Sequence, residues 1–189
     1  MGELLDKAIL FAANAHRGQK RKIFNTPFIL HPLEAAAIAA WFTNDEEVLA
    51  SAVLHDVLED TDTDAETIRR EFGERVFALV AHDTEDKQRD RKASDSWTDR
   101  KKASLEKMAR LGDNNVKYIW IGDKLSNMRS FYRAYLEHGN RIWEFTNQKD
   151  AKMQEWYYRS ILEILRPDFR DSAAWKELSF LIDKVFENQ

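Results

Sequence analysis

Apolar residues recur every three or four positions along most of this sequence, which is the spacing that lines one face of an α-helix. Only six Gly and three Pro occur in 189 residues, whereas all-β folds need many turns that contain these residues. The sequence therefore predicts an all-α protein. We expect helices over residues 3–16, 32–42, 48–60, 63–72, 74–82, 98–111, 115–133, 150–165 and 172–187.

The joints between these helices are short. Thr63–Glu66 reads "TDAE", which matches a capping box and predicts a helix start. Gly73 separates that helix from the next one. Residues 83–96 contain a single apolar residue, which indicates a solvated connection. Nothing in this pattern divides the chain, so we expect one domain over residues 1–189.

Composition excludes several classes of protein. With 43% hydrophobic and 12% aromatic residues the chain can bury a sizeable core. No apolar run approaches the roughly 20 residues that span a membrane, and the N-terminus has no basic region typical of a signal peptide. The absence of Cys is consistent with the cytoplasm, and a net charge of −4 argues against nucleic-acid binding. The sequence does not indicate the oligomeric state.

One apolar helix carries an unusual set of polar groups in "AVLHDVLEDT", residues 52–61. At about 100° per residue, His55, Asp56, Glu59 and Asp60 fall within one arc of about 140°. Three carboxylates on one partly buried arc repel one another unless a cation neutralises them. Imidazole with carboxylate suits Mn, Fe, Zn or Ni. The alternative is a solvated helix face on which His55 is an ordinary surface or core histidine.

Two further residues are candidate ligands. His31 precedes Pro32 at the start of a predicted helix, and Asp123 follows the apolar run "YIWIG". Asn127 lies one helical turn after Asp123, on the same face. Either His31 or Asp123 alone reads equally well as a packed or paired buried residue. The reading of the arc as an ordinary solvated helix face becomes weaker when these two candidate ligands are added to it.

These residues belong to longer motifs. An "HD" pair with an upstream His and a downstream Asp resembles the HD-domain phosphohydrolases. "AHRGQKRK", "TPFILHP", "AVLHDVLEDT", "FGERVFALV" and "GDKLSNMR" resemble the hydrolase domain of the RelA/SpoT homologue family, in particular its stand-alone small alarmone hydrolases. The resemblance covers about residues 3–166. It implies an all-α HD-domain bundle with a metal site in its centre, a Mn²⁺ cofactor, and hydrolysis of the 3′-pyrophosphate of (p)ppGpp to GDP or GTP and pyrophosphate.

The resemblance also assigns roles to individual residues. It implies a metal-ligand set of His31, His55, Asp56 and Asp123, and a water-activating pair of Glu59 and Asp60. It implies substrate contacts from Arg21, Lys22 and Asn127 and, by looser matches, from Lys101 and Tyr157. Arg21 and Lys22 end the run "HRGQKRK", which holds four Lys or Arg in seven residues and suits a polyanionic substrate.

The sequence departs from the family at two places, the loop "AHDTEDK" and Phe28, where the family usually has Tyr. Two alternative functions stay open. One is another HD phosphohydrolase, acting on NADPH, on deoxynucleotides or on a nucleotide 2′- or 3′-phosphate. The other is a metal-dependent nucleotide binder without catalysis, which would have no need of Glu59 and Asp60. At 189 residues the sequence is too short to carry the family's synthetase or regulatory domains.

Overall fold

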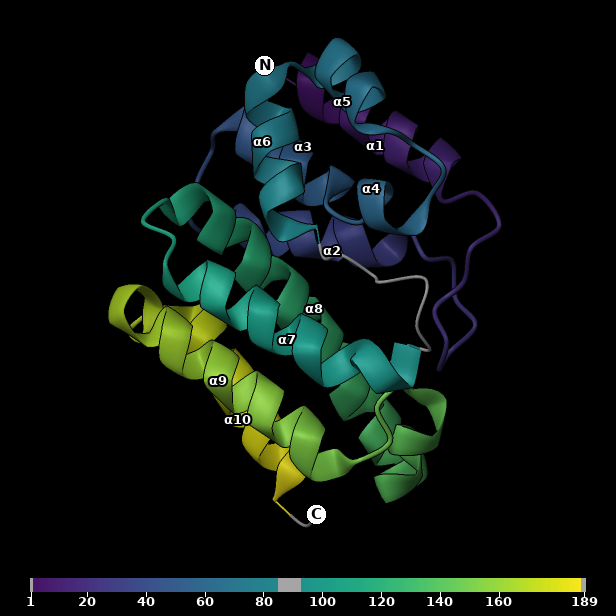
Figure 1. Cartoon of the computed structure of the whole chain (residues 1–189), viewed down its shortest axis with the longest axis vertical. Helices are drawn as coiled ribbons and strands as arrows, with labels where there is room; N and C mark the ends of the chain where they lie inside the picture. Colours follow the sequence, from purple (N-terminus) through teal and green to yellow (C-terminus); the bar gives the residue numbers. More distant parts are fainter. Residues whose placement is uncertain (1, 85–92, 188–189) are drawn as a thin grey trace. The chain divides into compact units, whose positions relative to one another are not determined.

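The computed structural model describes residues 2–84 and 93–187 (Figure 1). Within these ranges every regular element is a helix, and one isolated antiparallel bridge joins Lys20 to Pro27. This confirms the all-α prediction. The helices are α1 (Glu3–Ala15), α2 (Leu30–Ala39), α3 (Glu46–Leu54), α4 (Val57–Asp60), α5 (Ala65–Phe72), α6 (Glu74–Asp83), α7 (Ala93–Ala109), α8 (Asn114–His138), the 3₁₀ helix η1 (Gly139–Phe145), α9 (Ala151–Phe169) and α10 (Ala173–Phe186).

The chain forms two compact units, and α8 contributes residues to both. The first unit comprises Met1–Arg21, Asn25–Thr84 and Asp113–Ser126. The second comprises Lys22–Phe24, Glu85–Gly112 and Asn127–Gln189. None of the described helices is both long enough and apolar enough to cross a membrane.

Helix α3 forms the core of the first unit. Residues 50–54 are all buried, so this helix is enclosed on every side, as expected of a helix that is apolar all round. It packs against α1, α2 and α6, and α5 packs against α6 (Figure 1). The Asp45 side chain caps its N-terminus by accepting a hydrogen bond from the Glu47 N–H. The C-terminus of this buried helix delivers His55 and Asp56.

A close approach between α2 and α8 fixes the other side of the same core. Gly122 lies against the backbone of Ala35, and a Cβ at position 122 would meet the Ala35 carbonyl oxygen and lie 3.1 Å from its carbonyl carbon. Only Gly permits this approach. It brings the segment that carries His31 next to the segment that carries Asp123.

The second unit is built around α9, which packs against α7 and α10. Phe131 of α8 meets the rings of Trp143 and Tyr158 edge-on, with centroids 5.8 Å apart in both pairs. Phe186 of α10 stacks on Trp143 at 5.2 Å. The predicted C-terminal helix therefore forms and packs into an aromatic core. Such ring pairs add to the free energy of area burial.

Three local predictions were wrong. The predicted helix over residues 48–60 is two helices, because α3 ends at Leu54 and α4 begins at Val57. The His55 ring donates to the carbonyl of Ala52 in the last turn of α3, which satisfies a carbonyl that helix continuation would otherwise use. The N-cap of α5 is Asp64, whose side chain accepts from the Thr67 N–H, so the capping box does not start at Thr63.

The third error concerns the connection predicted over residues 83–96. Residues 85–92 lie outside the described ranges, but α7 already begins at Ala93, and Ser96 and Trp97 are buried. Trp97 is the large apolar side chain that is buried near the start of α7.

Candidate metal centre

Four predicted ligands converge in the first unit. His31 comes from α2, His55 and Asp56 from the turn between α3 and α4, and Asp123 from α8. The Nε2 atom of His31 lies 3.1 Å from Asp123 Oδ1 and 3.5 Å from Asp56 Oδ2. The Nε2 atom of His55 lies 3.2 Å from Asp56 Oδ2 and 3.8 Å from Asp123 Oδ1. Ligand atoms of His31, His55 and Asp123 all lie within 4.8 Å of one another.

The far side of each imidazole is already hydrogen-bonded. His55 Nδ1 donates to the Ala52 carbonyl oxygen at 2.7 Å. His31 Nδ1 lies 2.9 Å from Ser126 Oγ, and that hydroxyl donates its proton to Glu34 Oε2 at 2.7 Å. Ser126 therefore accepts from His31, which places the proton of a neutral His31 on Nδ1. In the neutral form both Nε2 lone pairs face the carboxylates.

Burial and neighbouring charges have opposite effects on the carboxyl groups of this cluster. Burial lowers the pKa of His31 below its usual value, although the hydrogen bond that a protonated His31 would donate to Asp123 opposes the shift. Burial raises the pKa of the Asp123 carboxyl, but the charge of Lys124, which pairs with it, and the hydrogen bond from a protonated His31 bring it well below its usual range. Burial acts in the same way on Asp56, and the neighbouring His55 and His31 lower the pKa of Asp56 below its usual value. Ionised carboxylates therefore face a histidine that burial keeps from accepting a proton.

A divalent metal ion fits this donor set. The two Nε2 lone pairs and the carboxylate oxygens would hold it, and the hydrogen bonds at both Nδ1 atoms would orient the rings, as partners of metal-bound histidines do. His31, His55 and Asp123 are buried, so they would shield a bound ion from water.

Glu59 and Asp60 follow the ligands on α4. Both are half-buried, and the Asp60 N–H donates to the Asp56 carbonyl oxygen at 2.8 Å. The amide of Gln19 donates to the Asp60 carbonyl oxygen at 2.7 Å, which ties α4 to the loop after α1. The short α4 is thus tied to another segment at its C-terminal end, directly after the predicted ligand pair.

The two basic residues that end the run "HRGQKRK" lie in different surroundings. Arg21 belongs to the first unit, where its guanidinium lies 5.9 Å from the Phe28 ring centroid and its charge contributes to the lowered pKa of His31. Lys22 belongs to the second unit, where its ammonium donates to Asn147 Oδ1 at 3.0 Å. In the first unit, Arg21 thus lies near the predicted metal ligands, as does Lys124, whose ammonium pairs with Asp123.

The second unit brings the two loosely matched residues together. The Lys101 ammonium lies 5.1 Å from the Tyr157 ring centroid, and the ring of Trp97 meets Tyr157 edge-on at 5.8 Å. Lys101 and Trp97 lie one turn apart on α7. Asn127 is half-buried on α8, four residues after Asp123.

Comparison with known proteins matches an HD domain to residues 8–148, which is most of the chain. The chain belongs to the HD-domain family.

The relatives that the chain resembles include proteins named as pyrophosphohydrolases and as pyrophosphokinases. The chain is 31% identical over 185 residues to the guanosine-3′,5′-bis(diphosphate) 3′-pyrophosphohydrolase of Aquifex aeolicus, covering 98% of this chain and 24% of the relative. It is 36% identical over 127 residues to MESH1 of Mus musculus, a pyrophosphohydrolase with the same name, covering 66% of this chain and 67% of MESH1. The chain spans between 14% and 25% of the length of six bacterial pyrophosphohydrolases and pyrophosphokinases that it matches.

Two solved structures have the same fold. One is a metazoan orthologue of SpoT that hydrolyses ppGpp, with a TM-score of 0.74, 26% identity, and coverage of 98% of this chain and 94% of the other. The other is lmo0812 of Listeria monocytogenes EGD-e, with a TM-score of 0.71, 31% identity, and coverage of 83% and 99%. The predicted resemblance to the RelA/SpoT homologue hydrolases is confirmed.

Sequence reasoning missed the groups that support this HD-domain site. Ser126, Glu34 and Gln19 all make hydrogen bonds that fix a ligand or α4. Helical spacing carried a signal, because Ser126 lies three residues after Asp123 and Glu34 three residues after His31. Nothing in the sequence shows that these two faces meet.

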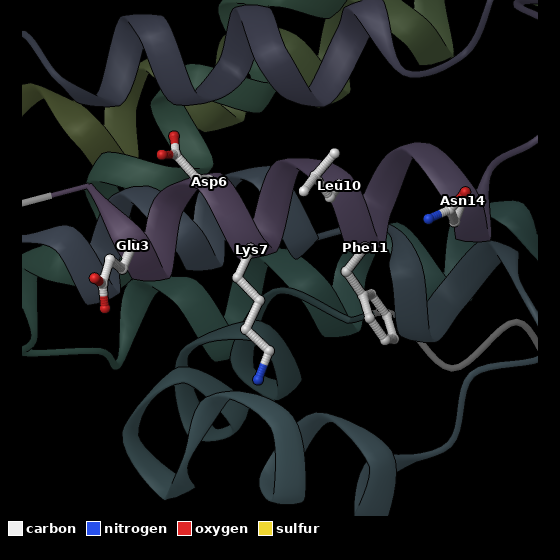
Figure 2. A pocket seen from close by; sticks show the side chains of 6 residues that line it. All are labelled: Glu3, Asp6, Lys7, Leu10, Phe11 and Asn14. Carbon is white, nitrogen blue, oxygen red and sulfur yellow. The ribbon is translucent and has the colours of Figure 1, made fainter.

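A hollow elsewhere on the HD-domain chain is separate from this cluster. It runs along α1, and Figure 2 shows Lys7 and Phe11 extending from one side of the helix and Asp6 and Leu10 from the other. All the residues that line it lie on α1, and none is a predicted site residue: Glu3, Asp6, Lys7, Leu10, Phe11 and Asn14. It is a groove on the surface of one helix, and none of the residues proposed to bind metal or substrate lines it.

Proposed function

We propose that this protein is a metal-dependent hydrolase that removes the 3′-pyrophosphate of (p)ppGpp, yielding GDP or GTP and pyrophosphate. The observation that carries the proposal is the buried pair of imidazoles whose Nε2 atoms lie 3.1–3.8 Å from two carboxylates. Relatives that bear the name of this activity support the choice of substrate.

We assign the metal to His31, His55, Asp56 and Asp123. Manganese suits this set better than magnesium, because magnesium favours oxygen ligands and keeps its waters. When bound, the ion would polarise the phosphoryl oxygens and lower the pKa of a coordinated water. The protein's own contribution is to hold the two imidazoles by their Nδ1 atoms and to keep the carboxylates ionised.

Glu59 and Asp60 are the proposed water-handling pair. They lie on a short helix that begins one residue after Asp56, and Gln19 holds the last carbonyl of that helix. A carboxylate so positioned can orient a water molecule and accept its proton as the nucleophile attacks phosphorus.

Substrate contacts are proposed for five residues named by the resemblance. The Arg21 guanidinium, a bidentate donor, suits the pyrophosphate, and Lys22 adds a positive charge. Asn127, Lys101 and Tyr157 offer an amide, an ammonium and an aromatic ring, which suit a guanine nucleotide. We further propose that residues 1–189 act as one HD phosphohydrolase domain, because α8 belongs to both compact units.

The test is product analysis. The protein is incubated with ppGpp or pppGpp and Mn²⁺, with and without excess EDTA, and the products are separated by ion-exchange chromatography. GDP or GTP with one equivalent of pyrophosphate is expected only when Mn²⁺ is present. A parallel panel of NADPH, deoxynucleoside triphosphates and 3′-phosphorylated nucleotides tests the alternative substrates. Tight binding of ppGpp without turnover would contradict the proposal and favour a metal-dependent binder.

A further inference from the structure

Hydrogen bonds through a buried hydroxyl connect one candidate ligand to a half-buried carboxylate that the proposed reaction does not use. His31 Nδ1 lies 2.9 Å from Ser126 Oγ, and Ser126 Oγ lies 2.7 Å from Glu34 Oε2. Ser126 is 1% exposed and His31 is 5% exposed. These two hydrogen bonds run from His31 on α2 to Ser126 on α8 and back to Glu34 on α2.

The direction of the protons in this chain follows from what each group can donate. A carboxylate accepts, so the single Ser126 proton goes to Glu34. The hydroxyl oxygen can then only accept from the imidazole, which requires the proton on Nδ1. This tautomer leaves Nε2 as the unprotonated nitrogen, and Nε2 is the atom that faces Asp123 at 3.1 Å.

We propose that Ser126 and Glu34 are positioning residues that select the metal-binding tautomer of His31. Without the Glu34 acceptor, the Ser126 hydroxyl is able to donate to Nδ1. The imidazole proton then moves to Nε2, where it blocks the ligand position and donates to Asp123 instead. This inference rests on the proposed function only in assigning a metal to His31.

The arrangement differs from that of the other imidazole ligand. His55 Nδ1 donates to a backbone carbonyl, which is an acceptor at every pH and cannot reverse its role. The hydroxyl at Ser126 can reverse, so it needs Glu34 to fix its direction. Fixing the tautomer of His31 therefore requires two side chains, whereas a backbone carbonyl is enough to fix that of His55.

The test compares four variants with the wild type. Ser126→Ala removes the acceptor, Glu34→Met removes the group that orients the hydroxyl, and Glu34→Gln keeps an acceptor oxygen without the charge. Ser51→Ala is the matched control, because its buried hydroxyl donates only to the Glu47 carbonyl within α3 at 2.6 Å. Mn²⁺ affinity is measured from the free-ion signal in electron paramagnetic resonance, and the His31 tautomer from ¹⁵N NMR of the metal-free proteins.

We expect Ser126→Ala and Glu34→Met to weaken Mn²⁺ binding by about 10–100-fold, the usual effect of losing a group that is hydrogen-bonded to a metal-binding histidine. Their His31 signal should move toward the Nε2-protonated tautomer. Glu34→Gln and Ser51→Ala should keep both the wild-type tautomer and an affinity within a few-fold of the wild type. Unchanged tautomer and affinity in Ser126→Ala and Glu34→Met would overturn the inference. If the wild type bound no Mn²⁺, the proposed function would fail, and the tautomer comparison would still decide the role of Ser126 and Glu34.

Discussion

At the scale of single residues, the candidate site separates into groups that hold a cation and groups that act on water. His55 and Asp56 contact the other predicted ligands, whereas Glu59 and Asp60 lie on the next helix. We expect Glu59→Gln and Asp60→Asn to keep Mn²⁺ stoichiometry near one and to lower kcat by about 10²–10⁴-fold. His55→Ala and Asp56→Asn should lose the metal itself.

Elemental analysis beside single-turnover hydrolysis separates the two roles. If the Glu59 and Asp60 variants lost metal as readily as the His55 and Asp56 variants, all four groups would be ligands.

A second residue-scale prediction concerns substrate charge. Arg21→Ala should raise the KM for ppGpp by about 10–100-fold, because a charge-assisted hydrogen bond to phosphate contributes about 1.5–3 kcal/mol. Arg17→Ala is the matched control, since Arg17 belongs to the same basic run but is exposed and pairs with Asn14 at 2.6 Å. Steady-state kinetics at two salt concentrations measures both, and equal KM values for the two variants would contradict a specific role for Arg21.

At the scale of elements, the contact between α2 and α8 should be the most sensitive packing point of the site. Gly122→Ala places a methyl group against the Ala35 backbone, which cannot move without α2. We expect a loss of about 1–3 kcal/mol in the free energy of unfolding and weaker Mn²⁺ binding, because His31 and Asp123 move apart. Gly112→Ala has open space around the new Cβ and should leave both quantities unchanged. Urea denaturation and Mn²⁺ titration of the two variants check the prediction.

The start of α1 depends on a carboxylate from α3. Glu46 Oε1 accepts hydrogen bonds from the N–H groups of Gly2, Leu4 and Leu5 at 2.9–3.1 Å. The hydrogen bond from Leu5, followed by those from Leu4 and Gly2, lowers the pKa of Glu46 below its usual value of 4.5, although some desolvation opposes the shift. A carboxyl whose pKa is lower in the folded state stabilises that state above its unfolded-state pKa, and this stabilisation disappears as pH falls through the folded-state value.

We therefore expect the wild-type Tm to fall as pH drops below 4.5, the usual pKa of Glu46, and Glu46→Gln to flatten that part of the profile. Glu106→Gln, at an exposed position of α7, is the control for loss of one carboxylate. Thermal melts at several acidic pH values compare the Tm profiles of the wild type and the two variants. A profile of Glu46→Gln as steep as that of the wild type would show that this cap carries no acid sensitivity.

At the scale of the whole molecule, metal binding should be visible as stability. Binding to the folded state alone stabilises it by about 2.7 kcal/mol when free Mn²⁺ is 100 times its dissociation constant. We expect Mn²⁺ to raise Tm and EDTA to lower it and to abolish turnover. Full activity in excess EDTA, with no metal found by elemental analysis, would contradict the assignment of the metal centre.

The sequence predicted most helices because helix formation follows from local spacing. The metal-ligand set came from the family resemblance and stays a prediction, although the structure brings its four side chains together. The break between Leu54 and Val57 was missed because the His55 side chain, which takes the Ala52 carbonyl, has the same helical spacing as its neighbours. The hydrogen bonds from His31 through Ser126 to Glu34 could not be predicted, because they join two helices that lie far apart in sequence. The role of Mn²⁺, the cytoplasmic location and the absence of nucleic-acid partners stay predictions.

The long sequence separation within the site also orders events during synthesis. His31 and Ser126 are 95 residues apart, and Asp123 lies on the same late helix as Ser126. At about 5–20 residues per second, a ribosome makes His31, His55 and Asp56 several seconds before α8. The growing chain thus holds three predicted ligands before it has the fourth or the hydroxyl proposed to orient His31. We therefore expect the complete predicted metal centre to form only after α8 has been made.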